Sequence, residues 1–379
     1  MRTDRTLMLM LMLMLGVALT ACSGPVQRAP TSDAVPVVAA PQQAPAPQEP
    51  APDYATLRLT VAATGDIMLG TDYPEPRLAA DDGISYLDAA TPLLQSADVA
   101  FGNLEGVLMD GGEPEKACTN PAACYLFRSP PRYAGLLAAA GFDVMSLANN
   151  HARDFGEAGR DASMAALAAA GIRQSGREGE IASWEQNGLR IALIAFSPTR
   201  ESWQLLTIDA AAAAVAELAA AHEIVIVSFH GGAEGQPGAE RLGFGMEYAY
   251  GEQRGDLVAF AHAVIDAGAD LVLGHGPHVP RALELYNERL IAYSLGNFAT
   301  YYGISVAGAK GYAPLLWAEL DGLGRFQGGR VHSFIQRRPD GPQRDPQNRA
   351  LEMMRELTRL DFPAGRLQIG VDGAVAALP

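Results

Sequence analysis

The sequence predicts a layered α/β domain in which helices cover a buried sheet. Short apolar runs alternate with helix-like segments from about residue 57 to residue 273 of the 379-residue chain. Most of these runs are continuous rather than alternately apolar and polar, which is typical of strands that are buried on both faces. After Arg281 the pattern becomes rich in strands. About three hundred residues are ample for one such domain, which could carry a small subdomain.

Each element of the alternation is expected from its own composition. Most of the strands are runs of Val, Ile, Leu, Phe and small apolar residues, and we expect them at residues 57–63, 98–101, 143–147, 184–186, 191–196, 223–229 and 270–273. The helices between them are rich in Ala or Leu and are expected at residues 87–94, 132–140, 157–170, 209–221 and 252–267. Later strands are expected at residues 282–286, 290–293, 314–320 and 330–336. This order favours a sheet with helices packed on its faces.

The first residues predict export and a lipid anchor. Arg2 and Arg5 precede an uncharged run of Leu and Met. This run is too short to span a membrane, so residues 1–21 are expected to form a signal peptide. The Leu-Thr-Ala-Cys sequence that ends at Cys22 resembles the bacterial lipobox, whose cysteine is acylated and becomes the first residue of the mature protein. A plain secretory signal with Cys22 close to the cleavage site is the alternative.

The mature chain is therefore expected to be lipid-anchored in the cell envelope, with its domain on the periplasmic face. Ser23, rather than Asp, follows the cysteine, which favours the outer membrane of a two-membrane bacterium. Residues 22–55 consist largely of Pro, Ala and Gln and cannot bury a core. We expect them to form an extended, disordered tether that lets the domain stand off the membrane.

The charge of the chain argues against nucleic acid as a partner. The formal net charge is −15, and residues 1–21 carry a net +1 from two arginines and one aspartate, so the mature chain has −16. An acidic protein repels nucleic acid and anionic head groups, although acidity also serves simple solubility. An anionic polymer substrate would require a bound metal ion to reverse the local field.

Two further cysteines, Cys118 and Cys124, lie close together in a loop-like segment. An envelope compartment permits a disulfide between them, which would contribute about 2 kcal/mol of stability. A zinc pair is the alternative, but the sequence has no second cysteine pair and no histidine nearby. We therefore favour the disulfide.

Polar residues follow five of the expected strands. Ligands of open α/β sheets lie just beyond the carboxyl ends of strands, so these residues are expected to meet along one edge. Glycines beside each cluster allow sharp turns that bring the side chains together. The residues are Asp66, Asn103, Glu105, Asn149, Asn150, His151, His230, Glu234, His275 and His278.

Carboxylate, amide and imidazole groups gathered in this way suit a divalent metal ion such as zinc, manganese or iron. Each cluster also has an ordinary structural explanation. Asp66 could cap a helix, the Asn-Asn-His sequence could form a turn, and a lone histidine could be a satisfied core residue. Five clusters at equivalent places in the strand pattern favour a common metal site over five coincidences.

The same motifs, taken in order, resemble the CapA family, the poly-γ-glutamate capsule-synthesis proteins that are related to the calcineurin-like metallophosphoesterases. The resemblance runs from about Leu57 to about Tyr302. It implies a layered, metallophosphoesterase-like β-sandwich flanked by helices over residues 56–305, with the strands and helix of residues 306–379 completing the same domain. The motifs are Gly65-Asp66-Ile67, Asn103-Leu104-Glu105-Gly106, Leu147-Ala148-Asn149-Asn150-His151, His230-x-Gly232-x-Glu234, Gly274-x-x-Pro277-His278 and Tyr293-Ser294-Leu295-Gly296-Asn297-Phe298.

The resemblance implies a metal-binding role for several of these residues. Asp66 and His278 would bind a first divalent ion, and Glu105 would bridge this ion to a second one. Asn150 and His230 would hold the second ion. One or two ions of manganese, zinc or iron are therefore the expected cofactors, and a pair of ions would generate a hydroxide and clamp a phosphoryl group.

His151 would be the catalytic residue, because in the related phosphoesterases the histidine after the ligand asparagine protonates the leaving oxygen. His275 is a further candidate metal ligand. Residues expected to bind substrate or support the ligands are Asn103, Asn149, Asp154, Glu234 and Asn297.

Three positions depart from the family pattern. Met68 stands where typical metallophosphoesterases have a ligand histidine, so the first ion would have one imidazole fewer. Gly276 replaces the first histidine of the usual His-Pro-His sequence, and His275 could substitute for it. Gly231 replaces the usual aromatic residue after His230, which is expected to open that side of the pocket.

Three functions are compatible with these residues. The first is a metal-dependent hydrolase that acts on a phosphoester or a related bond of an envelope polymer. The second is an anchored, non-catalytic accessory factor for export or attachment of poly-γ-glutamate or another anionic polymer, with membrane proteins of a polymer synthase as partners. The third, a periplasmic nucleotidase-like phosphatase, is less favoured, because no basic or aromatic cluster in the sequence forms an obvious platform for a nucleobase.

Overall fold

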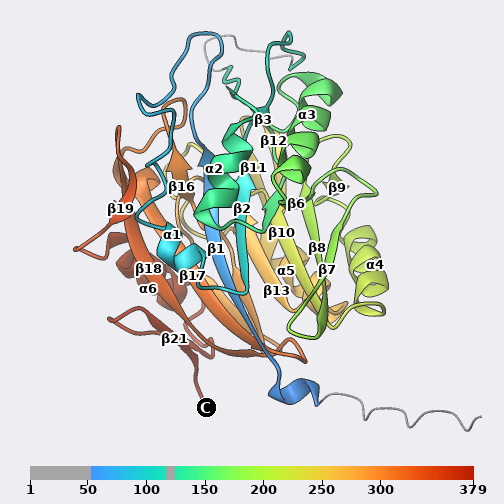
Figure 1. Cartoon of the computed structure of the whole chain (residues 1–379). Helices are drawn as coiled ribbons and strands as arrows, with labels where there is room; N and C mark the ends of the chain where they lie inside the picture. Colours follow the sequence, from blue (N-terminus) through green and yellow to red (C-terminus); the bar gives the residue numbers. More distant parts are fainter. Residues whose placement is uncertain (1–52, 117–123) are drawn as a thin grey trace, which may run out of the picture. The chain divides into compact units, whose positions relative to one another are not determined.

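Two β-sheets packed face to face form the centre of the protein, as the computed structural model shows (Figure 1). The structure describes residues 53–116 and 124–379, which belong to one compact unit, Pro52–Pro379. The predicted signal peptide, the acylation site Cys22, nearly all of the tether and Cys118 of the predicted disulfide lie outside the described residues. Within the described part of the chain, no helix is long and apolar enough to cross a membrane.

The first sheet is built around β1 (Arg58–Met68). This strand pairs in parallel with β2 and β16 and antiparallel with β17. The sheet runs in the order β20 (Leu367–Ile369), β21 (Ala374–Ala377), β18 (Phe326–Arg337), β17 (Tyr312–Asp321), β1, β2 (Val99–Leu104), β5 (Val144–Ser146) and β6 (Arg173–Ser175), with β16 (Asn297–Thr300) beside β1 and β19 (Gly341–Arg344) beside β18.

The second sheet has a parallel centre formed by β8, β10, β13 and β15. Its order is β14 (Leu283–Tyr286), β15 (Arg289–Ala292), β13 (Leu271–His275), β10 (Ile224–His230), β8 (Leu189–Ser197) and β7 (Ala182–Gln186), with β9 (Trp203–Gln204) beside β8. Two small strand pairs complete the described β-structure, namely β11 (Met246–Ala249) with β12 (Glu252–Asp256), and β3 (Val107–Leu108) with β4 (Arg128–Ser129).

Three apolar layers hold the sandwich together. The inner layer joins the two sheets and includes Val61 of β1, Ile226 of β10 and Leu273 of β13, all fully buried. Burying each such side chain stabilises the fold by about 1.5–3 kcal/mol. The outer faces are covered by α1 (Thr91–Leu94), α2 (Tyr133–Ala140) and α3 (Gly156–Ala169) on the first sheet and by α4 (Ile208–Ala219) and α5 (Leu257–Asp266) on the second.

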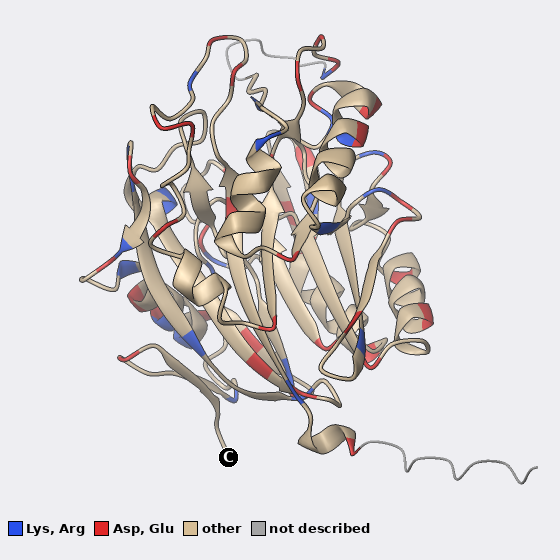
Figure 2. Cartoon of the chain, viewed as in Figure 1, with Lys and Arg blue, Asp and Glu red and all other residues tan. Residues whose placement is uncertain are grey.

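The C-terminal helix and two short 3-10 turns complete the unit. Helix α6 (Arg349–Asp361) packs against β17, β18 and β14, and its Leu351 and Met354 reach the inner layer. The 3-10 turns are η1 (Tyr54–Thr56) and η3 (Gly308–Gly311). Acidic and basic residues are interspersed over the outer loops and helices (Figure 2).

The predicted layered α/β sandwich flanked by helices is confirmed, and its strands divide between two large sheets. The predicted helix at residues 252–267 is wrong in its first turn. Its beginning is β12, and the helix starts only at Leu257, where the Asp256 side chain accepts a hydrogen bond from the Ala259 amide. The helix predicted at residues 87–94 is limited to Thr91–Leu94.

Candidate metal centre

Residues from both sheets meet at the ends of their parallel strands. Asp66 lies in β1 and Glu105 directly follows β2, while His278 comes from the loop after β13 in the other sheet. Each of the three offers one ligand atom, and these atoms all lie within 4.8 Å of one another. All three residues are buried. The structure therefore joins two carboxylates and an imidazole from a stretch of chain in which Asp66 and His278 are 212 residues apart.

Within the described residues, the carboxylate of Glu105 has no hydrogen-bond partner on either oxygen, although it is fully buried. Its Oε1 lies 3.6 Å from His278 Nε2 and 3.9 Å from His230 Nε2. Burial raises the pKa of Glu105 to about 8, and Asp66 and Glu234 add to the rise while His278 opposes it. An unpaired buried carboxylate is costly unless a cation compensates it. Glu105 therefore fits the role of a ligand to a cation.

The two residues expected to hold a second ion each have a buried polar atom without a partner in the described part of the chain. Nε2 of His230 and the side-chain oxygen Oδ1 of Asn150 make no hydrogen bond within the described residues. Both belong to segments that follow or end parallel strands, His230 at the end of β10 and Asn150 after β5. Imidazole, amide and carboxylate groups are ligands that zinc, manganese or iron accepts. The residues present thus fit a divalent ion.

The orientation of His278 is set by its neighbours. Its Nδ1 lies 3.0 Å from Asp66 Oδ2 and 2.9 Å from Asn297 Oδ1, and the Asn297 amide donates to two backbone carbonyls, which fixes Oδ1 toward the histidine. Nδ1 therefore carries a proton, and Nε2 points to Glu105 and Glu234, with 3.6 Å to each. Burial lowers the pKa of His278, but Glu105 and Asp66 outweigh it and raise the pKa to about 10. An imidazolium thus neutralises part of the carboxylate charge in the free protein.

A chain of amides orients Asp66. The His151 backbone N–H donates to Asn149, whose side chain donates to Asn103 Oδ1, and the Asn103 amide donates to Asp66 Oδ1 at 2.9 Å. Burial raises the pKa of Asp66, but the His278 hydrogen bond and the charges of His278, His275 and His230 together outweigh it and lower the pKa to about 2. Asp66 is therefore ionised at neutral pH. Asn103 and Asn297 thus hydrogen-bond to Asp66 and His278, and Asn149 hydrogen-bonds to Asn103.

The Asn103 amide nitrogen also lies 3.3 Å from Nδ1 of His230. Burial lowers the pKa of His230 well below its usual value, so the ring is neutral. With Nδ1 accepting from Asn103, the ring proton sits on Nε2. Coordination through Nε2 therefore requires that proton to move to Nδ1, which would end the contact that Nδ1 accepts from Asn103.

His275 lies outside the group of three ligands. Its Nε2 donates to the Thr64 backbone carbonyl at 3.1 Å, and its ring packs against Phe101. Burial lowers the pKa of His275. The structure therefore gives this predicted ligand a hydrogen bond between the two sheets in place of a position beside Asp66, Glu105 and His278.

His151 forms a separate polar pair beside Asn150. Its Nδ1 lies 2.8 Å from Asp154 Oδ2, and its ring stacks against Phe127 with the ring centres 4.3 Å apart. Lys116 Nζ contacts Asp154 Oδ1 at 3.0 Å and donates to the Asn150 carbonyl at 3.0 Å. Burial lowers the pKa of His151 against the raising effect of Asp154. The ring is therefore neutral, with Nδ1 directed to Asp154.

Sequence reasoning missed three residues near the site. Lys116 pairs with Asp154, Arg254 pairs with Glu234 at 3.3 Å, and the Tyr250 hydroxyl donates to Glu234 at 3.2 Å. Lys116 stands in a predicted loop and Arg254 in a predicted helix, so neither carried a signal in the local pattern. Their roles depend on pairing with side chains distant in the chain.

The prediction that Gly231 opens the pocket is wrong. A Cβ atom at this position would lie 2.4 Å from a methyl group of Leu205 and 2.5 Å from the Arg254 carbonyl oxygen. At Gly276, where φ is +119°, a Cβ atom would lie 2.3 Å from the Gly231 carbonyl oxygen. The chain fills this space, and the two glycines allow the ends of β10 and β13 to approach closely.

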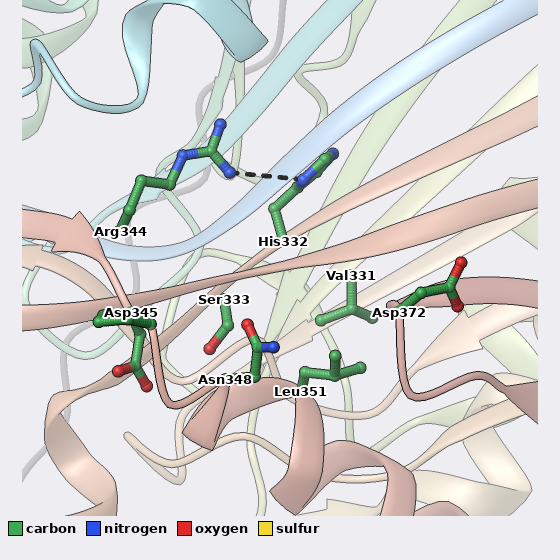
Figure 3. Close-up of a pocket in the computed structure, with 9 residues that line it drawn as sticks. Val331, His332, Ser333, Arg344, Asp345, Asn348, Leu351 and Asp372 are labelled. Carbon is green, nitrogen blue, oxygen red and sulfur yellow. Dashed lines mark hydrogen bonds between the residues drawn. The ribbon is translucent and has the colours of Figure 1, made fainter.

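A hollow of about 390 Å³ lies elsewhere, between β18, β19 and the start of α6 (Figure 3). Arg344 and His332 face one another across it at 3.4 Å. Its Asp345 carboxylate is already bonded by the Gln347 and Arg349 amides and by the Arg349 guanidinium. None of the predicted site residues lines this hollow, so it is not part of the metal centre.

Comparison with known proteins gives related sequences from bacteria. A probable polyglutamine synthesis accessory protein of Mycobacterium tuberculosis is 31% identical over 274 residues, which cover 65% of this chain and 65% of that protein. The capsule biosynthesis protein CapA of Bacillus anthracis is 28% identical over 256 residues, which cover 64% of this chain and 59% of that protein. The chain thus matches slightly less than two thirds of the length of these relatives.

Solved structures with a similar arrangement include a 5'-nucleotidase precursor from Thermus thermophilus, at 16% identity and a TM-score of 0.40, with 79% of this chain and 59% of that chain covered. The NAD nucleotidase of Haemophilus influenzae is similar at 13% identity and a TM-score of 0.38, with coverages of 79% and 63%.

The family model described as bacterial capsule synthesis protein PGA_cap matches residues 60–302, more than half of the chain. This match and the CapA relatives confirm the resemblance seen in the sequence motifs. The protein is therefore a member of the bacterial capsule synthesis protein family PGA_cap.

Proposed function

We propose that the protein is a lipid-anchored, metal-dependent hydrolase that cleaves a phosphoester or a related bond during synthesis or export of poly-γ-glutamate or a similar anionic polymer. The observation that carries this proposal is the buried Glu105 carboxylate. It has no hydrogen-bond partner among the residues that the structure describes, and it faces Nε2 of both His230 and His278. The names of the relatives, which refer to capsule and polyglutamine synthesis, support the polymer.

The residues that would hold one or two ions of manganese, zinc or iron are Asp66, Glu105, Asn150, His230 and His278. Such an ion, when bound, acts as a Lewis acid and makes a water molecule nucleophilic at neutral pH. The chain itself orients Asp66 and His278 through Asn103 and Asn297 and buries both side chains. Supporting hydrogen bonds of this kind raise both the precision and the basicity of metal ligands.

His151 is the candidate proton donor. Asp154 accepts from Nδ1 and so fixes the ring, which leaves Nε2 to face a substrate. Because burial lowers the pKa of His151, the ring is neutral before substrate binds. A nearby anionic oxygen raises the pKa of an imidazole, so a bound phosphoester would allow the ring to take up a proton and pass it to the leaving oxygen.

The hydrolase proposal is tested by turnover of a chromogenic phosphodiester with the purified mature protein. We expect no turnover after chelation and recovery on adding manganese, zinc or iron. Nucleoside monophosphates in the same panel test the nucleotidase alternative. Absence of turnover with every ion and substrate would reject the hydrolase.

Metal binding is expected to release protons and to strengthen as the pH rises. In the free protein the pKa of Glu105 is raised to about 8 and that of His278 to about 10, so both groups hold protons at neutral pH that a cation must displace. The apparent affinity for zinc should therefore increase between pH 6 and pH 9. Calorimetry in buffers of different ionisation enthalpy measures the released protons. Proton release of zero at pH 7 would contradict this account of the site.

A non-catalytic accessory role is the second candidate, favoured by Met68. Its side chain is buried in an apolar cluster with Phe127 and Ile304, at the position where the resemblance places a ligand histidine in active phosphoesterases. The relative from M. tuberculosis is named an accessory protein. Binding of poly-γ-glutamate by metal-stripped protein, without turnover by the loaded protein, would favour this role. Membrane proteins of a polymer synthase are the partners we propose for it.

The proposed anchor predicts that Cys22 is acylated and that the domain stands on the periplasmic face, with the outer membrane favoured. Metabolic labelling with an alkyne fatty acid should label the wild type and leave Cys22→Ala unlabelled. Ser23→Ala, which keeps the cysteine, should label like the wild type. Equal labelling of Cys22→Ala and the wild type would reject the anchor.

A further inference from the structure

Arg254 is a buried cation next to the candidate metal centre. It lies in β12 and is only 4% exposed. Its Nη2 donates to Glu234 Oε2 at 3.3 Å, while its Nε is buried without a hydrogen-bond partner within the described residues. The Arg254 carbonyl accepts from the Gly232 amide at 2.9 Å, which ties β12 to the segment that follows His230. The guanidinium is therefore held in place, but its Nε–H group is left without an acceptor among the residues described.

Glu234 connects this cation to the metal centre. Its Oε2 accepts from Arg254, and its Oε1 lies 3.6 Å from His278 Nε2. One carboxylate thus separates the guanidinium from a candidate metal ligand. Glu105 lies at the same 3.6 Å distance from His278 Nε2, so Glu234 stands at the edge of the ligand group.

The edge of the Arg254 guanidinium that carries Nε and Nη2 suits an anionic ligand with two oxygens. Nε and Nη2 form the side-on pair of donors of a guanidinium, which matches the two oxygens of a carboxylate or two oxygens of a phosphate. Glu234 takes only Nη2, and at a long distance for a charged pair. An oxyanion that accepted from both nitrogens would satisfy the buried Nε–H as well. Lys116, another cation at the site, is already paired with Asp154 and the Asn150 carbonyl.

Glu234, the partner of Arg254, is also bound by a tyrosine at the surface. The Tyr250 hydroxyl donates to Glu234 Oε1, and Tyr250 is 72% exposed. Tyr125, also exposed, is close enough to Tyr250 to contribute to the rise in the pKa of its hydroxyl. Rotation of Glu234 and Tyr250 away from Arg254 would expose the guanidinium beside the metal ligands.

We infer that Arg254 is a specificity-determining residue that binds a carboxylate or phosphate group of the substrate, and that Glu234 occupies it when substrate is absent. The inference rests on the proposed function for the position of the reacting bond, but the binding of an oxyanion requires no turnover. Substrate displaces Glu234 from Arg254, and the freed carboxylate remains on the side of His278 and Glu105. Both a γ-linked glutamate chain and a phosphoester present the oxyanion that this geometry recognises.

The test is calorimetric titration of the full mature protein, metal-loaded and metal-stripped, with inorganic phosphate and separately with a γ-linked glutamate oligomer. Arg254→Gln should weaken binding of the recognised anion by about 10- to 100-fold, the range for a charge-assisted hydrogen bond. Arg254→Lys should recover only part of it, because an ammonium lacks the paired donors. Glu234→Gln should strengthen binding several-fold, because the competing carboxylate is removed. Arg190→Gln, which removes an exposed ion pair with Glu223, is the matched control and should bind like the wild type.

The two titrants identify the source of the oxyanion. The recognised anion is the one whose affinity falls in Arg254→Gln. Wild-type affinity of Arg254→Gln for both titrants would overturn the inference. If Arg254→Gln does not fold, as judged by its unfolding transition, the absence of any gain in Glu234→Gln overturns it instead. Binding that depends on Arg254 without any turnover would reject the proposed hydrolase and keep the anion site. Turnover with a KM that is unchanged in Arg254→Gln would support the hydrolase and reject the anion site.

Discussion

Glu105→Gln is expected to lower metal affinity by at least about 100-fold and, in the same protein, to stabilise the metal-free fold by about 1–3 kcal/mol. The two effects have opposite signs because one carboxylate is responsible for both. In the described part of the chain its buried oxygens accept no hydrogen bond, so the ionised form is costly without a metal ion and can coordinate one that is present. If Glu105 were an ordinary structural residue, its replacement would destabilise the protein and leave metal affinity unchanged.

The stability gain of Glu105→Gln should depend on pH. The pKa of Glu105 is raised from 4.5 to about 8, so the folded protein binds this proton more tightly than the unfolded chain does. The folded state is therefore destabilised progressively as the pH rises from about 4.5 to about 8, and the penalty is complete above that. The glutamine variant lacks this penalty. Its advantage should be near zero at pH 4.5 and largest above pH 8.

Chemical unfolding of chelator-treated protein at several pH values measures the gain, and zinc titration measures the affinity. Asp345→Asn is the matched control, because Asp345 is a buried carboxylate whose two oxygens are both bonded by Gln347 and Arg349. This variant should lose stability and bind zinc like the wild type. A Glu105→Gln variant that is less stable than the wild type at pH 8 and keeps its zinc affinity would refute the role given to Glu105.

His151→Ala is expected to lower kcat by about 10²- to 10⁴-fold without changing the metal content. The ring is positioned by Asp154 and Phe127 and makes no contact with Asp66 or Glu105 that metal binding requires. The change therefore removes the proton donor and leaves the ligand group. Phosphodiester turnover and elemental analysis on the same samples separate the two effects.

The control for His151→Ala is His222→Ala, which removes a surface histidine that contacts Ser183 and Leu218. It should retain wild-type turnover. Equal rates for the wild type and His151→Ala would end the catalytic assignment of His151, whereas loss of the metal from His151→Ala would show that the residue acts on the ligands.

The fold was largely predictable because each core element carries its own signal. Continuous apolar runs such as Ile224–His230 mark strands buried on both faces, and Ala-rich segments such as Ile208–Ala219 mark the covering helices. The division into two sheets was not predictable from these runs, because strand partners are chosen by contacts distant in sequence. The same holds for Glu252–Asp256, which forms a strand only because β11 lies beside it.

The rim of the site was also predictable, because polar residues that follow parallel strands gather at the carboxyl ends of those strands. Asp66, Glu105 and His278 were expected to meet, and the structure brings them within 4.8 Å. Lys116 and Arg254 could not be recognised, since each is placed at the site by an ion pair with a carboxylate distant in sequence. His275 follows a strand like the other histidines, but its backbone hydrogen bond to Thr64 is visible only in three dimensions.

The most direct test of a cation between the two sheets is anomalous diffraction from crystals of the mature protein soaked in manganese or zinc. We expect a peak within bonding distance of Glu105 and His278, next to Asp66. A map without a peak there, or with peaks only at surface carboxylates, would contradict the metal centre and the hydrolase built on it.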